Sequence, residues 1–421
     1  HEQVRSTRTI LKQAVCRMKI VHVISSIDPA KGGPQGGCVR LAAAQSALGH
    51  DVHIISYGGI ETQDRAFLSA RDVPYFSNIR WHLLRDPDRI ERLLGYKASR
   101  LLRTLLKDAS FVHIHGVWES ILKNAASIAR QNLVPYCLEP HGMLDVWSMS
   151  QKRLKKQLAL FLGYRKMLDR AKFILALNTD EAQLLGPLGL RAPNLIIPNG
   201  IFLEEFAALP QKGFFRELLP ELDGKRIVFF LSRLHTKKGL DILAAAFAQL
   251  ARSHPDVNLV VAGPDDGARD GFVALVNQLG MKDRVHIVGP LYGSDKLRAL
   301  VDATCFCLPS RQEGFSVAIT EAMACGLPVV ISDACHFPEV KSAHAGAVVS
   351  LDAVEVAAAL ASILDSPAMA SAMGSNGQRL VRENYTWPRI AEQTIKGYTS
   401  GDNRGIKNVV NPRRLVPAAD H

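Results

Sequence analysis

The sequence predicts an α/β protein made of two doubly wound, Rossmann-like domains that face each other across a cleft. Three observations support this fold class. Short apolar runs rich in Val and Ile alternate with longer helical patterns, this alternation occurs in two series, and a turn-rich segment separates the series. Continuous apolar strands between helices are typical of parallel sheets covered on both faces.

The strands of both series can be placed from their apolar runs. We expect the first series at 19–25, 52–56, 111–115, 136–139, 173–177 and 195–198, and the second at 226–231, 258–262, 285–288, 304–308 and 328–332. The separating segment is 197–225. We therefore expect an N-terminal extension at 1–17, a first domain at 18–198, a second domain at 199–384, a C-terminal helix at 385–400 that crosses back to the first domain, and a flexible basic tail at 401–421.

Composition excludes several classes of protein. No run reaches the roughly 18 apolar residues of a spanning helix, and residues 1–17 are basic without the apolar core of a signal peptide. The seven cysteines show no metal-type spacing, which favours a reducing cytoplasm. The net charge of +11 favours an anionic partner, and no nucleic-acid-binding module accompanies it.

Two loops that follow strands contain residues suited to phosphate. The segment KGGPQGGC at 31–38 precedes a helix expected at 39–48, and its glycines would let the backbone approach an anion. It matches neither the dinucleotide nor the P-loop pattern, so a tight turn is the alternative. In LSRLHTKKG, Arg233 and Lys238 follow the first strand of the second series. They could clamp a diphosphate together, or they could be solvated loop charges.

The segment RQEGFSVAITEAMACGLPVV at 311–330 contains two glutamates separated by seven uncharged residues. We expect a helix at 315–325 whose first amides, at Gly314, Phe315 and Ser316, face an anion. Glu313 precedes this helix, and Glu321 is its only charge. A buried carboxylate needs a partner, so Glu321 either forms an internal salt bridge or binds hydroxyl groups of a ligand.

Together these motifs resemble the retaining glycosyltransferases of family four, which have the GT-B fold. The resemblance extends from Met18 to about Tyr398. Its pieces occur in the family's order: GGPQGG, HIHGVW, EPHGML, IPNGI, LSRLHTKKGLD, VAGPDD, VHIVGPL, EGFSVAITEAMACGLPVV and YTWPRIAEQ. The E-x7-E segment and the R-x4-K pair are specific in combination, whereas each alone is weak.

The resemblance implies a role for each candidate residue. The first domain would bind the acceptor and the second a nucleotide-sugar donor. The implied catalytic residues are Arg233 and Lys238 on the diphosphate, Glu313 on the donor sugar, and His141 near the transferred sugar. The implied donor-binding residues are Glu321 on the ribose, Gly314, Phe315 and Ser316 at the helix start, Val288, Gly289 and Leu291 near the base, and Gly33 near the phosphates.

Some features depart from the family or need another explanation. Phe202 follows IPNGI where the family usually has Asp, and Asn178 stands where Ser is common; both positions are expected to lie outside the central donor contacts.

The DPD string at 86–88 is interpreted as a polar turn rather than a metal site. His113 and His115 lack a third ligand for a metal, so we expect one packed histidine and one at the cleft edge. No metal or other cofactor is expected.

The stretch at 151–172 contains eight Lys or Arg residues and one Asp, a balance of +7, interleaved with Leu, Phe and Tyr. It is either an ordinary amphipathic helix or a surface for an anionic membrane, which would suit a polyprenyl-linked acceptor on the inner face of the cell membrane.

Taken as a whole, the sequence predicts a hexosyltransferase (EC 2.4 class) for cell-surface polysaccharide or lipopolysaccharide. The alternatives are a nucleotide-sugar 2-epimerase and a non-catalytic sugar-nucleotide-binding or membrane scaffold. Donor sugar, base, acceptor, linkage and oligomeric state are not determined.

Overall fold

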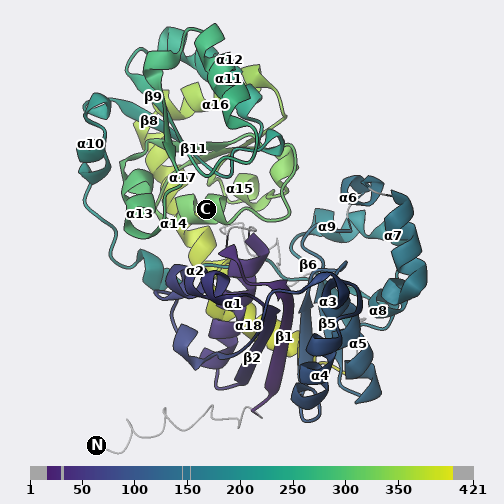
Figure 1. Ribbon diagram of the computed structural model, residues 1–421. Helices are drawn as coiled ribbons and strands as arrows, with labels where there is room; N and C mark the ends of the chain where they lie inside the picture. Colours follow the sequence, from purple (N-terminus) through teal and green to yellow (C-terminus); the bar gives the residue numbers. More distant parts are fainter. Residues whose placement is uncertain (1–16, 30–32, 145, 152, 402–421) are drawn as a thin grey trace, which may run out of the picture. The chain divides into compact units, whose positions relative to one another are not determined.

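The structure is a computed structural model that describes residues 17–29, 33–144, 146–151 and 153–401. The described chain forms two compact units, each around its own β-sheet (Figure 1). Unit 1 contains residues 17–176, 184–195 and 391–401, and unit 2 contains residues 177–183 and 196–390. The extension predicted at 1–17 and the tail predicted at 401–421 fall, except for one residue each, outside the described residues.

Unit 1 has a seven-stranded sheet in the order β3-β2-β1-β4-β5-β6-β7, and the strand pairs from β3 to β6 are parallel. Its strands are β1 (Lys19–Ser26), β2 (Asp51–Tyr57), β3 (Arg80–Leu84), β4 (Phe111–His115), β5 (Tyr136–Glu139), β6 (Phe173–Ala176) and β7 (Asn194–Ile196). Its helices are α1 (Gly33–Ala47), α2 (Ile60–Ala70), α3 (Arg89–Leu94), α4 (Tyr96–Leu105), α5 (Ser120–Gln131), α6 (Val146–Ser150), α7 (Arg153–Ala159), a π-helical segment η4 (Leu160–Tyr164) and α8 (Arg165–Asp169).

Unit 2 has a six-stranded parallel sheet in the order β10-β9-β8-β11-β12-β13. Its strands are β8 (Arg226–Leu231), β9 (Val257–Ala262), β10 (Val285–Gly289), β11 (Cys305–Leu308), β12 (Val329–Ser332) and β13 (Gly346–Val349). Its helices are α9 (Thr179–Leu184), α10 (Phe214–Leu218), α11 (Leu240–Ser253), α12 (Arg269–Gln278), α13 (Gly293–Asp302), α14 (Val317–Ala324), α15 (Glu339–Ser342), α16 (Ala353–Asp365) and α17 (Pro367–Asn384).

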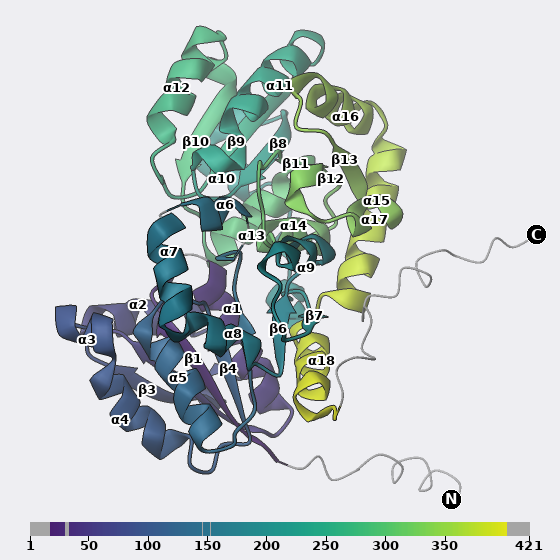
Figure 2. The same cartoon turned by 90° about the vertical axis from the view of Figure 1, so that its right-hand side faces the viewer.

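The last helix, α18 (Trp387–Thr399), belongs to both units. Its residues from Ala391 onward pack with unit 1 (Figure 2), where the ring of Tyr398 stacks on Phe111 with centroids 4.0 Å apart. Gly397 lies close to Leu195 and Phe173 of β7 and β6, so this part of the helix covers one face of the first sheet. A chain segment distant in sequence therefore completes the core of unit 1.

The strand orders of the two sheets are equivalent. In the first sheet, β2 and β3 lie on one side of β1, and β4 lies on its other side. In the second sheet, β9 and β10 lie on one side of β8, and β11 lies on its other side. Ligands of such sheets bind beyond the carboxyl ends of the strands where the order reverses. Ligand sites are therefore expected at the loops after β1 and β4 and at the loops after β8 and β11.

The predicted strands are all present within a residue or two of their expected ends, but β3 and β13 were not predicted. Both lie at sheet edges, and none of their residues is fully buried. β3 is short and contains Arg80 and His82, and β13 begins at Gly346, so neither shows a long apolar run. Both strands are only partly buried, so they lack the long apolar run of a strand covered on both faces.

None of the described helices is by itself long and apolar enough to span a membrane. Only α16 and α17 taken together meet that length and composition, and the two are bent by 103° at their junction.

Candidate active site

Lys238 and Glu313 meet beyond the carboxyl ends of β8 and β11. The two strands are parallel neighbours, with Phe229 opposite Phe306. Gly239, at φ +67°, lies so close to the carbonyl oxygen of Pro309 that a Cβ would be 1.8 Å from it, and only glycine fits there. This close approach joins the two loops. It places Lys238 Nζ at 2.7 and 2.8 Å from the two carboxylate oxygens of Glu313.

Glu313 is held from several directions. Ser310 Oγ donates a hydrogen bond of 2.6 Å to Oε1, and the backbone N–H of Glu313 donates to Ala334 O at 3.1 Å. The Glu313 side chain is only 8% exposed, and that of Lys238 is 13% exposed. A carboxylate that accepts bonds from an ammonium group and a hydroxyl group is positioned rather than free to attack.

Glu321 also has a basic partner. It lies within α14, and its Oε1 is 2.6 Å from Nζ of Lys296, which α13 contributes. Both side chains are partly buried. The internal salt bridge, one of the two alternatives drawn from the sequence, is therefore present. Binding of ribose hydroxyls by Glu321 stays a prediction, and it would require the carboxylate to change partners.

Arg233 is paired more loosely. Its NH1 donates to Asp266 Oδ2 at 2.7 Å, and the two side chains are 49% and 41% exposed. Exposed ion pairs of this kind contribute only about 0–1 kcal/mol. Arg233 can therefore exchange Asp266 for another anion at little cost.

The start of α14 differs from the prediction. The helix begins at Val317, two residues later than expected, with Ser316 as a buried N-cap residue in extended conformation that makes no side-chain capping bond. Phe315 instead packs its ring against Phe337 and Tyr385, with centroids 5.4 and 5.9 Å apart. This aromatic packing holds Phe315 out of the helix.

Asn178, which is expected to lie outside the central donor contacts, hydrogen-bonds the loop that contains the donor-binding candidate Gly314. Its Nδ2 donates a hydrogen bond to the carbonyl oxygen of Gly314, while its Oδ1 accepts one from the backbone N–H of Glu181 at 2.7 Å. The side chain thus ties the loop that follows Glu313 to the start of α9. Phe202, the other departure from the family, is fully buried in the core.

The remaining donor-binding candidates lie at the ends of other elements. Val288 and Gly289 close β10, and the carbonyl oxygen of Gly289 accepts a hydrogen bond from Gly263 N–H at 2.8 Å. Leu291 follows and packs on the core of unit 2. Gly33 is the exposed first residue of α1, whereas Lys31 and Gly32 of the same loop lie outside the described residues.

In unit 1, His141 belongs to a buried group of polar side chains that we call the histidine cluster. It consists of His22 on β1, Gln45 on α1, His113 and His115 on β4, Glu139 on β5, His141 in the loop after β5, and Tyr398 on α18. His141 has a positive φ of 53°, which only a constrained loop residue adopts. Its Nδ1 is 3.3 Å from Glu139 Oε1, and its Nε2 is 3.3 Å from His115 Nδ1.

The expectation that His113 and His115 lack a third residue for a metal site was wrong. Glu139 Oε2 is 3.2 Å from His113 Nε2 and 3.3 Å from His115 Nδ1, and His22 Nδ1 is 2.9 Å from His115 Nε2. Both histidines are buried, and neither is at an edge. Two triads, His22–His113–His115 and His115–Glu139–His141, have donor atoms within 4.8 Å, a spacing that could accommodate a metal ion.

Burial controls the charges in this cluster. Desolvation lowers the pKa of His22 well below its ordinary value and lowers the pKa of His115 to about 3. Burial alone would raise the pKa of Glu139, but the neighbouring His141, His113 and His115 outweigh it, so the pKa of this carboxyl lies well below its ordinary value. Glu139 is therefore ionised and surrounded by imidazole rings.

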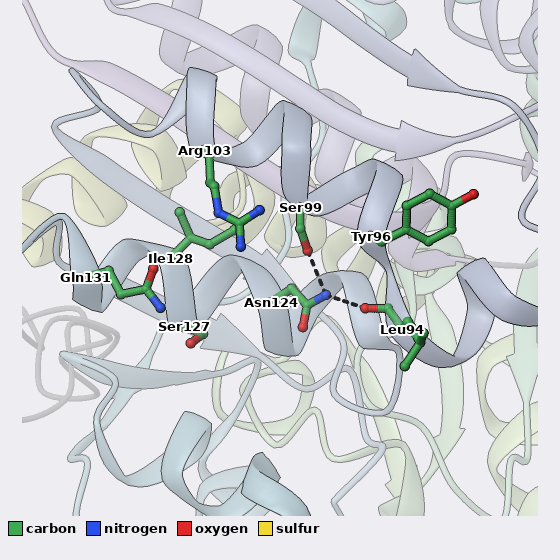
Figure 3. Close-up of a pocket in the computed structure, with 8 residues that line it drawn as sticks. All are labelled: Leu94, Tyr96, Ser99, Arg103, Asn124, Ser127, Ile128 and Gln131. Carbon is green, nitrogen blue, oxygen red and sulfur yellow. Dashed lines mark hydrogen bonds between the residues drawn. The ribbon is translucent and has the colours of Figure 1, made fainter.

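Two surface cavities contain none of the predicted residues. One of about 330 Å³ lies between α4 and α5 of unit 1, where Asn124 Nδ2 donates to Leu94 O at 2.7 Å and Ser99 Oγ at 2.9 Å (Figure 3). A larger one of about 760 Å³ lies in unit 2 beside Lys212, Arg216 and Gln378. Neither adjoins the carboxyl ends of the central strands.

Sequence reasoning missed several residues of both groups: Lys296, Ser310, Asn178, His22, Gln45, Glu139 and Tyr398. Lys296 and Tyr398 lie on helices, and no local sequence pattern shows how these helices pack against the sheet. Glu139 could have been found, because it ends a predicted buried strand and immediately precedes the motif that contains His141. A charged residue in a strand buried on both faces requires a partner.

Two family models match the chain. "Glycosyl transferase 4-like domain" matches residues 32–200, and "Glycosyl transferases group 1" matches residues 211–380. Together they account for most of the sequence. The chain belongs to the group 1 glycosyl transferases of the GT4 type, and its two parallel-sheet units have the GT-B fold. By family it is a hexosyltransferase.

Individual relatives agree with this placement. The chain is 32% identical over 209 residues to the MMP alpha-(1->4)-mannosyltransferase of Mycolicibacterium hassiacum, a match that spans 47% of this chain and 50% of that enzyme. It is 26% identical over 360 residues to the GDP-mannose:cellobiosyl-diphosphopolyprenol alpha-mannosyltransferase of Xanthomonas oryzae pv. oryzae, covering 81% and 86% of the two chains. The crystal structure of Anabaena Alr3699/HepE in complex with UDP and glucose matches with a TM-score of 0.73 and 20% identity, over 90% of this chain and 99% of that one.

Proposed function

We propose that this protein is a retaining, metal-independent glycosyltransferase. It would move a hexosyl unit from a nucleoside-diphosphate sugar to a saccharide or lipid-linked saccharide in the synthesis of cell-surface polysaccharide or lipopolysaccharide. One observation carries the proposal: Lys238 and Glu313 are joined beyond the ends of β8 and β11, where the strand order reverses. A cation and a carboxylate there suit a diphosphate and the sugar attached to it.

The chemical step requires stabilisation of the leaving nucleoside diphosphate. As the anomeric bond breaks, negative charge develops on the diphosphate, and groups already aimed at that position lower the barrier. Arg233 is loosely paired and can turn toward the phosphates, and Lys238 can contribute its positive charge from its place beside Glu313. The uncapped start of α14 adds backbone N–H groups and the positive end of the helix dipole.

Retention would follow from front-face attack, in which the leaving phosphate helps to remove the acceptor hydroxyl proton. Glu313 would position the donor sugar rather than attack it. The hydrogen bonds from Lys238 and Ser310 support this role, because they hold the carboxylate in one orientation and reduce its nucleophilicity. The anomeric configuration of the product, measured by NMR, tests this step, and an inverted product would contradict it.

The relatives named above are transferases, which favours transfer over epimerisation or binding alone. A panel of nucleotide sugars in a thermal-shift assay would first identify the donor through its stabilisation of the fold. Product analysis with that donor then separates transfer from 2-epimerisation and from binding alone. Activity unchanged by a chelator is expected, and strict loss of activity would contradict metal independence.

We also propose that unit 1 lies on the inner face of the cell membrane through a basic–apolar patch. The patch consists of Arg153, Leu154, Lys155 and Leu158 on α7, Phe161 and Leu162 on η4, and Lys166 on α8, all exposed. Leu154, Leu158 and Phe161 follow helical spacing, and Phe161 is 87% exposed. Apolar side chains flanked by cations suit an anionic lipid surface, where a polyprenyl-linked acceptor would be found.

Co-sedimentation with vesicles tests the patch. The protein should pellet with vesicles that contain acidic lipid and not with neutral ones, and the double variant Leu158→Ser, Phe161→Ser should stay in solution. Leu133→Ser is the matched control, because Leu133 of unit 1 is 90% exposed and lies outside the patch. Sedimentation that is independent of acidic lipid, or unaffected by the double variant, would contradict the proposal.

A further inference from the structure

Three segments of unit 2 meet beside Glu313. The first is the segment 313–316 before α14, which we call the donor loop, and every residue in it is a predicted site residue. The second is the start of α9, residues 178–181, and the third is the turn 333–336 after β12. All three belong to unit 2, and the second and third contain none of the predicted site residues.

The start of α9 contacts both of the other segments. Asn178 reaches the donor loop, where its Nδ2 donates a hydrogen bond to the carbonyl oxygen of Gly314. Asp180 reaches the turn 333–336, where its Oδ2 lies 2.6 Å from Nδ1 of His336. Both contacts join residues that are far apart in the sequence, so they fix how α9 packs against the carboxyl ends of β11 and β12.

The donor loop and the turn 333–336 are also joined to each other. The backbone N–H of Glu313 donates to the carbonyl oxygen of Ala334 at 3.1 Å. Beyond that bond, the ring of Phe315 packs against the ring of Phe337 with centroids 5.4 Å apart. Each of the three segments therefore contacts the other two, and the donor loop is held from both sides.

The amide of Asn178 has one possible orientation. Asn178 immediately precedes α9, and its Oδ1 accepts from the backbone N–H of Glu181 at 2.7 Å, as an N-cap residue does. Only the oxygen of the amide can accept there, so the nitrogen is the atom that faces the Gly314 carbonyl and donates to it. One half of the side chain caps α9, and the other half holds the donor loop.

The bond to Gly314 sets the direction of the next backbone N–H. The described chain contains no cis peptide bond, and in a trans peptide the C=O and the N–H of one unit point to opposite sides. Because the oxygen of Gly314 is turned toward Asn178, the N–H of Phe315 is turned away from α9. Among the described residues this N–H meets no backbone acceptor.

We propose that Asn178 is a positioning residue that aims the Phe315 N–H at the sugar diphosphate of the donor. This rests on the proposed function, which places the donor beside Glu313, two residues before Phe315. An N–H that is already aimed at the leaving diphosphate stabilises the developing charge without reorganising. The Asp180–His336 contact supports the same arrangement, because it keeps the start of α9 against the turn that binds Glu313.

Asn178→Asp separates the two halves of the side chain. Aspartate still caps α9, since its carboxylate can accept from the N–H of Glu181. It also places an acceptor against the carbonyl oxygen of Gly314, so the peptide before Phe315 loses its support. We expect kcat to fall roughly 10- to 100-fold and the donor KM to change by less, as steady-state kinetics with the identified donor would measure.

Asn376→Asp is the matched control in the same unit. Asn376 of α17 is also partly buried, its Nδ2 donates to His344 O at 3.1 Å, and its Oδ1 accepts from Arg379 at 3.0 Å. The same change therefore breaks the same kind of bond away from the donor loop, and kcat should stay at the wild-type value. Wild-type kcat in Asn178→Asp, or an equal fall in both variants, would overturn the positioning role.

NMR of the full chain with ¹⁵N-labelled phenylalanine tests the aim of the N–H without turnover. The Phe315 signal is assigned by its absence in Phe315→Tyr. It should shift when the nucleotide sugar identified in the thermal-shift panel is added to the wild-type chain, and this shift should be lost in Asn178→Asp. A Phe315 signal that does not move at saturating nucleotide sugar in the wild-type chain would overturn the inference.

Failure of this inference is distinguishable from failure of the proposed function. If the chain binds the nucleotide sugar and shifts the Phe315 signal through Asn178 but transfers no sugar, the proposed function fails and the role of Asn178 in aiming the N–H stands. If the chain transfers sugar while the Phe315 signal stays in place, the role of Asn178 fails and the proposed function stands.

Discussion

The two units place their polar groups at equivalent points of equivalent sheets, yet they use opposite chemistry there. In unit 2, the donor cluster (Arg233, Lys238, Lys296, Glu313 and Glu321) consists of cation–carboxylate pairs on loops and helices. In unit 1, the histidine cluster is a buried network in which hydrogen bonds join β1, α1, β4 and α18, and Glu139 of β5 lies 3.2 and 3.3 Å from ring nitrogens of His113 and His115.

The difference predicts how each cluster would respond to a ligand. The Arg233–Asp266 pair is exposed and can exchange partners at small cost, whereas the Lys238–Glu313 and Lys296–Glu321 pairs are partly buried. The rings of His22 and His113 are fully buried, and each ring nitrogen that loses its partner leaves a polar atom without solvent. We therefore expect substitutions in the donor cluster to affect activity first, and substitutions in the histidine cluster to affect stability as well.

The largest effect should come from Lys238→Ala. This change removes the partly buried cation nearest the proposed diphosphate, and loss of such a preorganised group lowers kcat by about 10²- to 10³-fold. Lys237→Ala is the control, since Nζ of Lys237 contacts Gln312 at 3.0 Å instead of Glu313. Steady-state kinetics with the identified donor measure both variants. Near wild-type turnover in Lys238→Ala would remove it from the mechanism.

Acid should destabilise the fold through the histidine cluster. The pKa values of His22 and His115 in the folded protein lie below the unfolded value of about 6.5. Below that pH the unfolded chain binds protons that the folded chain does not. Stability is therefore full above about pH 6.5 and falls by up to about 1.4 kcal/mol per pH unit per group as the pH drops.

Urea unfolding at pH 7.5 and 5.5 measures this loss. His344→Gln, which alters an exposed histidine of unit 2, should leave the pH dependence unchanged. Equal stability of the wild-type chain at the two pH values would contradict the neutral, buried state of His22 and His115.

A smaller effect is expected from Tyr398→Phe. The change keeps the ring that stacks on Phe111 but removes the hydroxyl that is hydrogen-bonded to His113 Nδ1 and accepts from Gln45. Two buried polar atoms lose a partner, at a cost of about 1–3 kcal/mol. Thermal unfolding should show the loss, while Tyr292→Phe, at a residue 73% exposed, should not. Unaltered stability in Tyr398→Phe would mean that the network is not cooperative.

The sequence predicted the architecture because a parallel sheet buried on both faces leaves continuous apolar runs, and only the edge strands β3 and β13 lack them. It also predicted Arg233, Lys238, Glu313 and Glu321, since these residues follow strand ends or interrupt an apolar helix. It could not show that Lys296 pairs with Glu321 or that Asn178 binds Gly314, because these contacts depend on how separate elements pack. Of the histidine cluster, His141, His113 and His115 were singled out, but His22, Gln45, Glu139 and Tyr398 were missed because they come from separate elements.

The central claim is that the carboxylates of the donor cluster, Glu313 and Glu321, bind the donor and do not serve only to stabilise the fold. Calorimetry of the identified donor binding to wild type, Glu321→Ala and Lys296→Ala tests this claim most directly. The account predicts that Glu321→Ala weakens donor binding by about 1.5–3 kcal/mol, because hydrogen bonds to a carboxylate are lost, and that Lys296→Ala does not weaken it. Unchanged affinity in Glu321→Ala, with lower stability in both variants, would show that the Lys296–Glu321 pair is only structural.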